Sequence, residues 1–161
     1  MLLCVSATMK FIVTNELGRL ARWLRIMGFD TVYFTSNNIG TLIIEALRED
    51  RFIITRRKSA IDDLQKKTLV LTVDKLEEQL KEVIQNLKLQ INESEMFTRC
   101  PLCNVLLREV KKEEAKEQIP PYVYKTQNEF RQCNLCKKVY WKGSHWGNIK
   151  EAISRQSSAI S

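Results

Sequence analysis

The sequence contains little glycine, proline and histidine: its 161 residues include 5 Gly, 3 Pro and 1 His. So few glycines and prolines exclude a collagen-like or linker-like chain. A content of 44% apolar residues also excludes a disordered chain. No apolar run approaches the roughly 18 residues that suggest a membrane-spanning helix. We therefore expect a soluble globular protein that does not enter a membrane.

A secretory signal is not recognisable in the first residues. Segment 1–8 is apolar, but it lacks a basic start, and it is short for a signal peptide, whose apolar stretch alone runs to about 7 to 15 residues. A lysine and a strand-like run follow Met9, which reads as a natural beginning. We expect residues 1–8 to be a flexible extension and the protein to be cytoplasmic.

Acidic residues are scarce in the last third of the chain. Residues 1–97 carry 14 basic and 13 acidic side chains, whereas residues 98–161 carry 12 and 6. Nearly all of the net charge of +7 therefore belongs to the second segment. A basic module beside a near-neutral one is typical of proteins that handle nucleic acid, because Lys and Arg neutralise phosphates. Solubility alone is the other interpretation of this charge.

Short apolar runs alternate with helical patterns between residues 9 and 97. Strands are expected at 9–13, 31–34, 52–55 and 69–72, and helices at 17–27, 39–49 and 75–87. Fully apolar strands that are separated by helices are typical of a parallel sheet covered on both faces. We predict a three-layer α/β/α domain over residues 9–97.

Four of the five cysteines form two pairs with the spacing of metal ligands. Cys100 and Cys103 make the first pair, and Cys133 and Cys136 make the second. Each Cys-x-x-Cys turn can aim two sulfurs at one tetrahedral ion, so the two pairs predict a structural zinc held by four thiolates. Two disulfides and a thioredoxin-like dithiol are the alternatives.

The predicted zinc ribbon covers residues 98–148. The 29 residues between the two cysteine pairs exceed the commonest interval, so this segment must hold its own structure. Its charge run, 111–117, is expected to be a solvated excursion. Residues 149–161 are expected to be a frayed tail.

Several motifs together resemble one known family. They are Leu17 to Arg25, Gly28-Phe-Asp30, Ala46 to Thr55, Arg99 to Asn104 and Gly143-Ser-His-Trp146. Over residues 9–148 the sequence resembles the Mut-seven carboxy-terminal RNase domain family. The resemblance implies a PIN-like nuclease domain followed by a zinc ribbon, with RNA cleaved at acidic residues that hold Mg²⁺ or Mn²⁺.

The acidic residues that this resemblance implies are missing from their positions. Thr14, Asn38 and Arg57 stand where the family pattern has aspartates. A site for two divalent ions needs several carboxylates, so the nuclease site is predicted to be degenerate and no catalytic residue is assigned. Mg²⁺ or Mn²⁺ is expected only if other acids replace the missing ones. The candidates are Glu16, Asp62, Asp63 and Asp74.

Two groups of basic residues are candidates for RNA contacts. Arg19, Arg22 and Arg25 follow one another at three-residue steps on the first helix, opposite its leucines. The second group flanks the last cysteine pair and is interleaved with aromatic side chains that could stack on bases. It consists of Lys137, Lys138 and Lys142, with Tyr140, Trp141 and Trp146 beside them. The role of the single histidine, His145, is left open.

The function predicted from the sequence is therefore RNA binding by a member of this RNase family with a degenerate nuclease site. An active metal-dependent endoribonuclease with non-standard acidic ligands is the first alternative. A protein-interaction module is the second, and no protein partner is identified.

Overall fold

A computed structural model describes residues 9–58, 66–143, 151 and 154–155 of the chain. The predictions for residues 1–8, for most of the tail and for His145 lie outside these ranges. The chain divides into two compact units, one up to Asn104 and one from Val105 onward.

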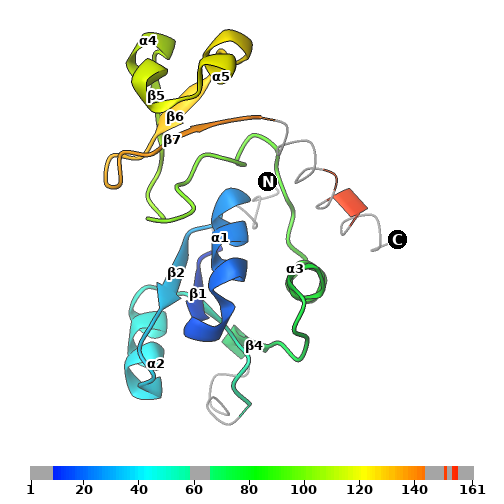
Figure 1. The fold of residues 1–161 in the computed structure, drawn as a ribbon. Helices are drawn as coiled ribbons and strands as arrows, with labels where there is room; N and C mark the ends of the chain where they lie inside the picture. The colour runs from blue at the N-terminus through cyan, green and yellow to red at the C-terminus, as the bar shows by residue number, and fades with distance from the viewer. Residues whose placement is uncertain (1–8, 59–65, 144–150, 152–153, 156–161) are drawn as a thin grey trace, which may run out of the picture. The chain divides into compact units, whose positions relative to one another are not determined.

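The first unit is built on a sheet of four parallel strands (Figure 1). The strands are β1 (Phe11–Thr14), β2 (Thr31–Phe34), β3 (Phe52–Thr55) and β4 (Thr68–Val70). Their order is β2-β1-β3-β4, so β1 and β3 are central. β1 pairs with β2 from Phe11 opposite Thr31, and with β3 from Phe11 opposite Phe52. All four residues of β1 are buried, which explains why this strand is an uninterrupted apolar run ending in Thr14.

Helices cover both faces of this sheet. Helix α2 (Ile39–Arg48) packs through Leu42 and Ala46 on one face, against Ile12 and Ile53. Helix α1 (Gly18–Ile26) contacts β1, β2 and α3 (Leu76–Asn86). The predicted α/β fold with a parallel sheet is confirmed, because the alternating apolar runs do form buried strands between helices.

Two residues fix the ends of the helices near the sheet. Asn38 precedes α2, and its Oδ1 accepts the Thr41 N–H at 3.1 Å, which satisfies one of the unpaired donors of the first turn. Gly28 follows α1 with φ of 98°, a conformation that favours glycine. A Cβ at Gly28 would lie 2.6 Å from the carbonyl oxygen of Glu95, so only glycine fits here without a shift.

The second unit contains a small antiparallel sheet. Its strands are β5 (Arg108–Val110), β6 (Phe130–Gln132) and β7 (Val139–Trp141) in sequential order. Between β5 and β6 the chain forms α4 (Lys112–Ala115), η4 (Lys116–Gln118) and α5 (Pro121–Thr126). Helices and sheet share an apolar cluster of Ala115, Ile119, Val123 and Phe130, on which Trp141 also packs.

The charged side chains of the run 111–117 are mostly exposed, as expected, and the run is helical. It forms α4 and the start of η4, and Ala115 within it is 1% exposed. The sequence did not predict this short helix, because one apolar residue among charged ones does not give a recognisable helical periodicity.

No helix that the structure describes has the length and apolar character needed to cross a membrane.

Candidate functional site

Polar residues gather where the parallel strands end. Thr14 and Thr55 are the last residues of β1 and β3, and Asn37 follows β2. Carboxyl ends of parallel strands meet at one edge of a sheet, which is where α/β folds bind their ligands. The Thr14 and Thr55 hydroxyl oxygens lie 3.0 Å apart and both are buried.

One carboxylate, Glu16, lies at the centre of this edge. The short helix η2 (Asn15–Leu17) follows β1 directly and carries Glu16 back toward β3. Its Oε1 lies 2.5 Å from the Thr14 hydroxyl and 3.2 Å from the Thr55 hydroxyl. It also accepts the backbone N–H of Arg56 at 3.0 Å. Glu16 is thus the one acidic replacement candidate that the structure places at the strand ends.

The guanidinium of Arg57 lies among oxygens at the same edge. Its Nη2 donates to Oδ1 of Asn15 at 2.7 Å and to Oδ1 of Asn37 at 3.1 Å. The same nitrogen is 3.6 Å from Oε2 of Glu16. Two amide oxygens and a carboxylate oxygen are ligands that a hard cation would use. Here they surround a covalently attached cation instead.

The protonation state of Glu16 is set by these neighbours. Partial burial alone would raise its pKa, but the hydrogen bonds from the Thr14 hydroxyl and the Arg56 N–H favour the ionised form. The positive charge of Arg57 acts in the same direction, and the net result is a lowered pKa. Glu16 is therefore a stable anion at neutral pH and a poor general base.

Of the other acidic candidates, Asp74 is the one that the structure describes, and it does not join Glu16. The Asp74 carboxylate is 82% exposed and forms an ion pair with Arg56. Asp62 and Asp63 lie outside the described residues. Asn38 is occupied as the cap of α2. Within the described ranges, the one group of three or more Asp, Glu, His or Cys side chains close enough to share an ion is made of cysteines.

That group consists of the four paired cysteines. The sulfurs of Cys100, Cys103, Cys133 and Cys136 all lie within 4.8 Å of one another. Four thiolates around a tetrahedral zinc at 2.3 Å would be about 3.8 Å apart, so this donor set fits the ion. All four sulfurs share one site rather than forming two separate pairs, which favours the metal interpretation over the disulfide alternative.

Both cysteine pairs use the same backbone turn. Asn104 N–H donates to the Cys100 carbonyl at 2.9 Å, and Lys137 N–H donates to the Cys133 carbonyl at 3.0 Å. Asn104 and Lys137 have φ of 66° and 63°, so each turn closes in the left-handed region. Backbone N–H groups of Leu135 and Cys136 point at the Cys133 sulfur at 3.4 and 3.5 Å. Such donors stabilise a thiolate, as metal binding requires.

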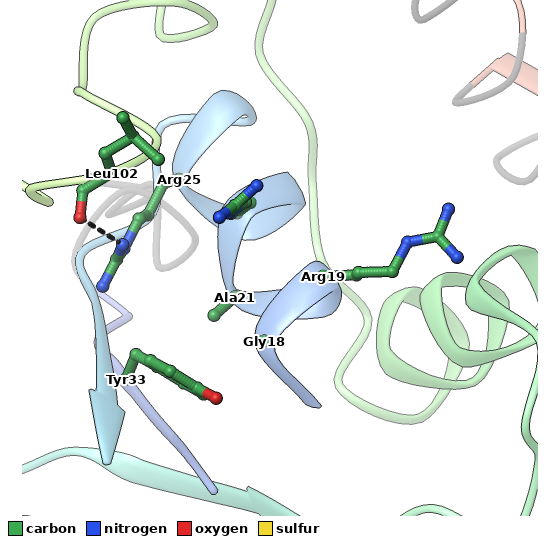
Figure 2. A pocket seen from close by; sticks show the side chains of 7 residues that line it. Gly18, Arg19, Ala21, Arg25, Tyr33 and Leu102 are labelled. Atoms are coloured by element: carbon green, nitrogen blue, oxygen red, sulfur yellow. Dashed lines mark hydrogen bonds between the residues drawn. The ribbon is translucent and has the colours of Figure 1, made fainter. Parts of the chain in front are cut away.

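Arg25 fastens the first cysteine pair to the α/β unit. Its Nη1 donates to the carbonyl oxygens of Pro101 at 2.9 Å and Leu102 at 3.0 Å, while Nε donates to the Thr31 carbonyl at 2.9 Å. Figure 2 shows the side chain extended from α1 toward the backbone of Leu102. Burial lowers the pKa of this guanidinium, and the negative charge of Cys100 and Cys103 opposes that effect.

Asp30 and Asn104 make a second connection between the same segments. Asn104 accepts the Thr31 N–H at 2.9 Å and donates from Nδ2 to Oδ1 of Asp30 at 2.8 Å. Arg51 donates to the same Asp30 oxygen at 2.8 Å and to Oε2 of Glu49 at 2.5 Å. Burial would raise the pKa of Asp30, but hydrogen bonds from Arg51 and Asn104 hold it below its usual range.

A comparison with protein-family models finds that the Mut7-C RNAse domain model matches residues 9–153. The chain belongs to the Mut7-C RNase domain family. The match extends over both the parallel-sheet unit and the four cysteines, so the fold and the cluster are parts of one family architecture. Neither the comparison with curated proteins nor that with solved structures found a match.

Several residues of the motifs that carried the Mut7-C resemblance form contacts near the first cysteine pair. Asp30, Glu49, Arg51 and Asn104 join in the network described above. The sequence interpretation gave these residues no role. The sequence did contain a signal for this network. Asp30 and Arg51 each stand directly before an apolar strand, and charged side chains at such positions need partners.

The candidate RNA-binding residues occupy different environments. Arg19 and Arg22 are exposed, whereas Arg25 is 8% exposed and hydrogen-bonded to three carbonyl groups. Steps of three residues turn a helix by about 60° less than a full circle, so Arg25 is rotated about 120° from Arg19. Lys137, Lys138 and Lys142 in the second unit are exposed. His145 and Trp146 lie outside the described residues.

We expect Arg25 to act on stability. Arg25→Lys keeps the charge but cannot reach three carbonyl oxygens, so the free energy of unfolding should fall by about 2–3 kcal/mol. Urea unfolding measures this change. Arg22→Lys, one turn away and exposed, is the matched control and should change stability by less than about 0.5 kcal/mol. An Arg25→Lys protein of unchanged stability would contradict this role.

We also expect Glu16 to stabilise the fold in a pH-dependent way. Because its pKa is lowered on folding, its contribution is present above the ordinary value of 4.5 and is lost as pH falls through the lowered value. Glu16→Gln should therefore be less stable than the natural protein at pH 7, and the difference should shrink below about pH 4.5. Urea titrations from pH 3 to 7 measure this. The exposed Glu129→Gln is the control, and an equal pH profile for both variants would refute the prediction.

Proposed function

We propose that this protein binds RNA through its basic surfaces and does not hydrolyse it. Membership of an RNase domain family supports RNA as the ligand. The absence of hydrolysis is inferred from Arg57, whose guanidinium nitrogen lies 2.7 to 3.6 Å from oxygen atoms of Asn15, Asn37 and Glu16. A divalent ion at this edge would have to displace a hydrogen-bonded cation, and among the residues that the structure describes it would gain one carboxylate ligand, Glu16.

Electrostatics make such a displacement unfavourable. Two-metal hydrolysis depends on several carboxylates that offset the repulsion between the ions. The strand ends instead carry the Thr14 and Thr55 hydroxyls, amide groups and Arg57 around a single Glu16. With Arg57 beside it, Glu16 contributes no net negative charge to the edge.

A metal-dependent endoribonuclease that uses Glu16 is the second candidate function. It is favoured by the position of Glu16 at the end of β1, where its oxygens face the end of β3. One carboxylate could hold one Mg²⁺ or Mn²⁺ together with water and substrate phosphate. For this function Arg57 would have to move aside.

We also propose that the four cysteines hold one structural zinc with no open coordination position. Two of the sulfurs, those of Cys100 and Cys133, belong to fully buried residues, which suits a closed site rather than a catalytic one. Zinc thiolates need reducing surroundings, so we place the protein in the cytoplasm.

Removal of one ligand should release the metal. The natural protein purified under reducing conditions is expected to contain one zinc per chain, and Cys133→Ser to contain almost none. Because a module this small depends on its ion for folding, trypsin should then cut faster between the two cysteine pairs, at Lys111, Lys112 and Lys116. Metal analysis and limited proteolysis measure both effects. Cys4→Ser, which leaves the four ligands intact, is the control. A metal-free natural protein would refute the zinc site.

Binding and cleavage of RNA separate the two candidate functions. The natural protein should bind single-stranded RNA with an affinity that falls steeply with salt, and it should produce no cleavage in Mg²⁺ or Mn²⁺ above a chelated control. Neutralising Lys137, Lys138 and Lys142 should reduce the salt slope by up to about one unit per lost phosphate contact. Anisotropy titrations and gel assays measure these quantities.

A variant with restored acids is the comparison for the cleavage assay. Thr14→Asp, Asn38→Asp and Arg57→Asp are combined, and aspartate at position 38 keeps a good cap for α2. Metal-dependent cleavage by the natural protein that is abolished in Glu16→Gln would establish the endoribonuclease instead. Absence of any RNA binding would overturn the proposed function altogether.

A further inference from the structure

A pocket of about 330 Å³ lies beside helix α1 in the first unit. Its lining contains three arginines, one tyrosine, one leucine and two small residues, and none of these described lining residues is acidic. The volume is at the lower end of the range of about 300 to 1,000 Å³ for small-molecule sites. The pocket therefore suits one flat, anionic group of nucleotide size.

Tyr33 provides a fixed aromatic surface in this pocket. It projects from the edge strand β2, and its hydroxyl donates to the carbonyl oxygen of Asn15 at 2.7 Å. A Cβ at Gly18 would lie 3.3 Å from the same hydroxyl oxygen, so the absence of a side chain at Gly18 lets the ring lie close to the start of α1. The residue is nonetheless 38% exposed. An aromatic ring that is held at its tip and open to solvent is prepared for stacking.

Two arginines near the pocket carry positive charges that are not paired with any described side chain. Within the described part of the chain, Arg19 and Arg22 have no hydrogen-bond or ion-pair partner, whereas Arg25 is committed to backbone carbonyls. Figure 2 shows the Arg19 side chain directed away from Tyr33 and Leu102. Arg19 is thus placed to bind a phosphate of a nucleic-acid strand that extends away from the pocket. Arg22, one turn further along the helix, is placed to bind a phosphate nearer the pocket.

We propose that this pocket binds one nucleotide of a single-stranded RNA, with its base stacked on Tyr33 and its flanking phosphates bound by Arg22 and Arg19. The proposal rests on the RNA-binding function above and names the site that recognises a base. A base inside a duplex is stacked on its neighbours and cannot enter such a pocket, so the ligand is single-stranded.

The first cysteine turn also contributes to the lining of the pocket. Leu102 lies between Cys100 and Cys103 and is 39% exposed, and its backbone carbonyl is held by Arg25. An exposed apolar side chain in the same lining can contact an apolar part of the bound nucleotide. The zinc turn and Arg25 therefore shape the pocket, while Tyr33 and Arg22 make the contacts.

The experiment compares two RNAs on the full-length protein. One is a short labelled single-stranded oligoribonucleotide, and the other has the same length and charge but abasic residues. Tyr33→Ala should weaken binding of the first about fivefold to a hundredfold, the range for one stacked base, and leave binding of the second unchanged. Tyr33→Phe should bind nearly as well as the natural protein. Arg22→Ala should weaken both RNAs and lower the salt slope by about one.

Matched controls exist on the same chain. Tyr122→Ala removes a tyrosine that is 68% exposed in α5, and Arg48→Ala removes an exposed arginine of α2. Equal effects of Tyr33→Ala and Tyr122→Ala on a protein that binds RNA would overturn the pocket but keep the RNA-binding function. No RNA binding by the natural protein would overturn both. If Tyr33→Ala does not fold, Tyr33→Leu keeps the bulk without the ring and must show the same loss for the base-containing RNA only.

Discussion

The hydrogen bonds of one carboxylate, Asp30, hold together parts of the first unit that are distant in sequence. Oδ1 of Asp30 accepts from both Arg51 and Asn104 at 2.8 Å, which ties the start of β2 to the start of β3 and to the first cysteine turn. Buried charges need such partners, since an isolated carboxylate or guanidinium inside a protein is costly. The α/β sheet and half of the metal ligand set are therefore one folded body.

This arrangement changes how the zinc ribbon should be understood. A ribbon is commonly regarded as a separate module, yet Cys100 and Cys103 lie in the first unit while Cys133 and Cys136 lie in the second. An ion at the proposed zinc site would act on the first unit through Cys100 and Cys103. Loss of metal should thus also loosen the loop of Leu102, which Arg25 and Asn104 hold against α1 and β2.

The sequence predicted the large elements because each has a strong local signal. Uninterrupted apolar runs such as that of β1 mark buried parallel strands, and two Cys-x-x-Cys turns mark four clustered thiols. Arg25 is buried while Arg19 and Arg22 are exposed, because residues at three-residue spacing are successively rotated around the helix axis. The partners of Arg57, Asn15 and Asn37, follow different strands, so only the sheet order brings them together. The residue pattern within one strand or helix does not contain the order of the strands in the sheet.

The Glu16–Arg57 pair also limits how this site can change by mutation. An aspartate at position 14 alone would be a buried carboxylate next to Glu16, and the hydrogen bond from the Thr14 hydroxyl to Glu16 would be lost. Removal of Arg57 alone would leave Asn15, Asn37 and Glu16 without their cation. Each of these single substitutions is therefore expected to destabilise the strand ends. A change to a metal-binding edge would have to pass through such variants or alter positions 14 and 57 together, because the guanidinium of Arg57 already takes the place of a cation there.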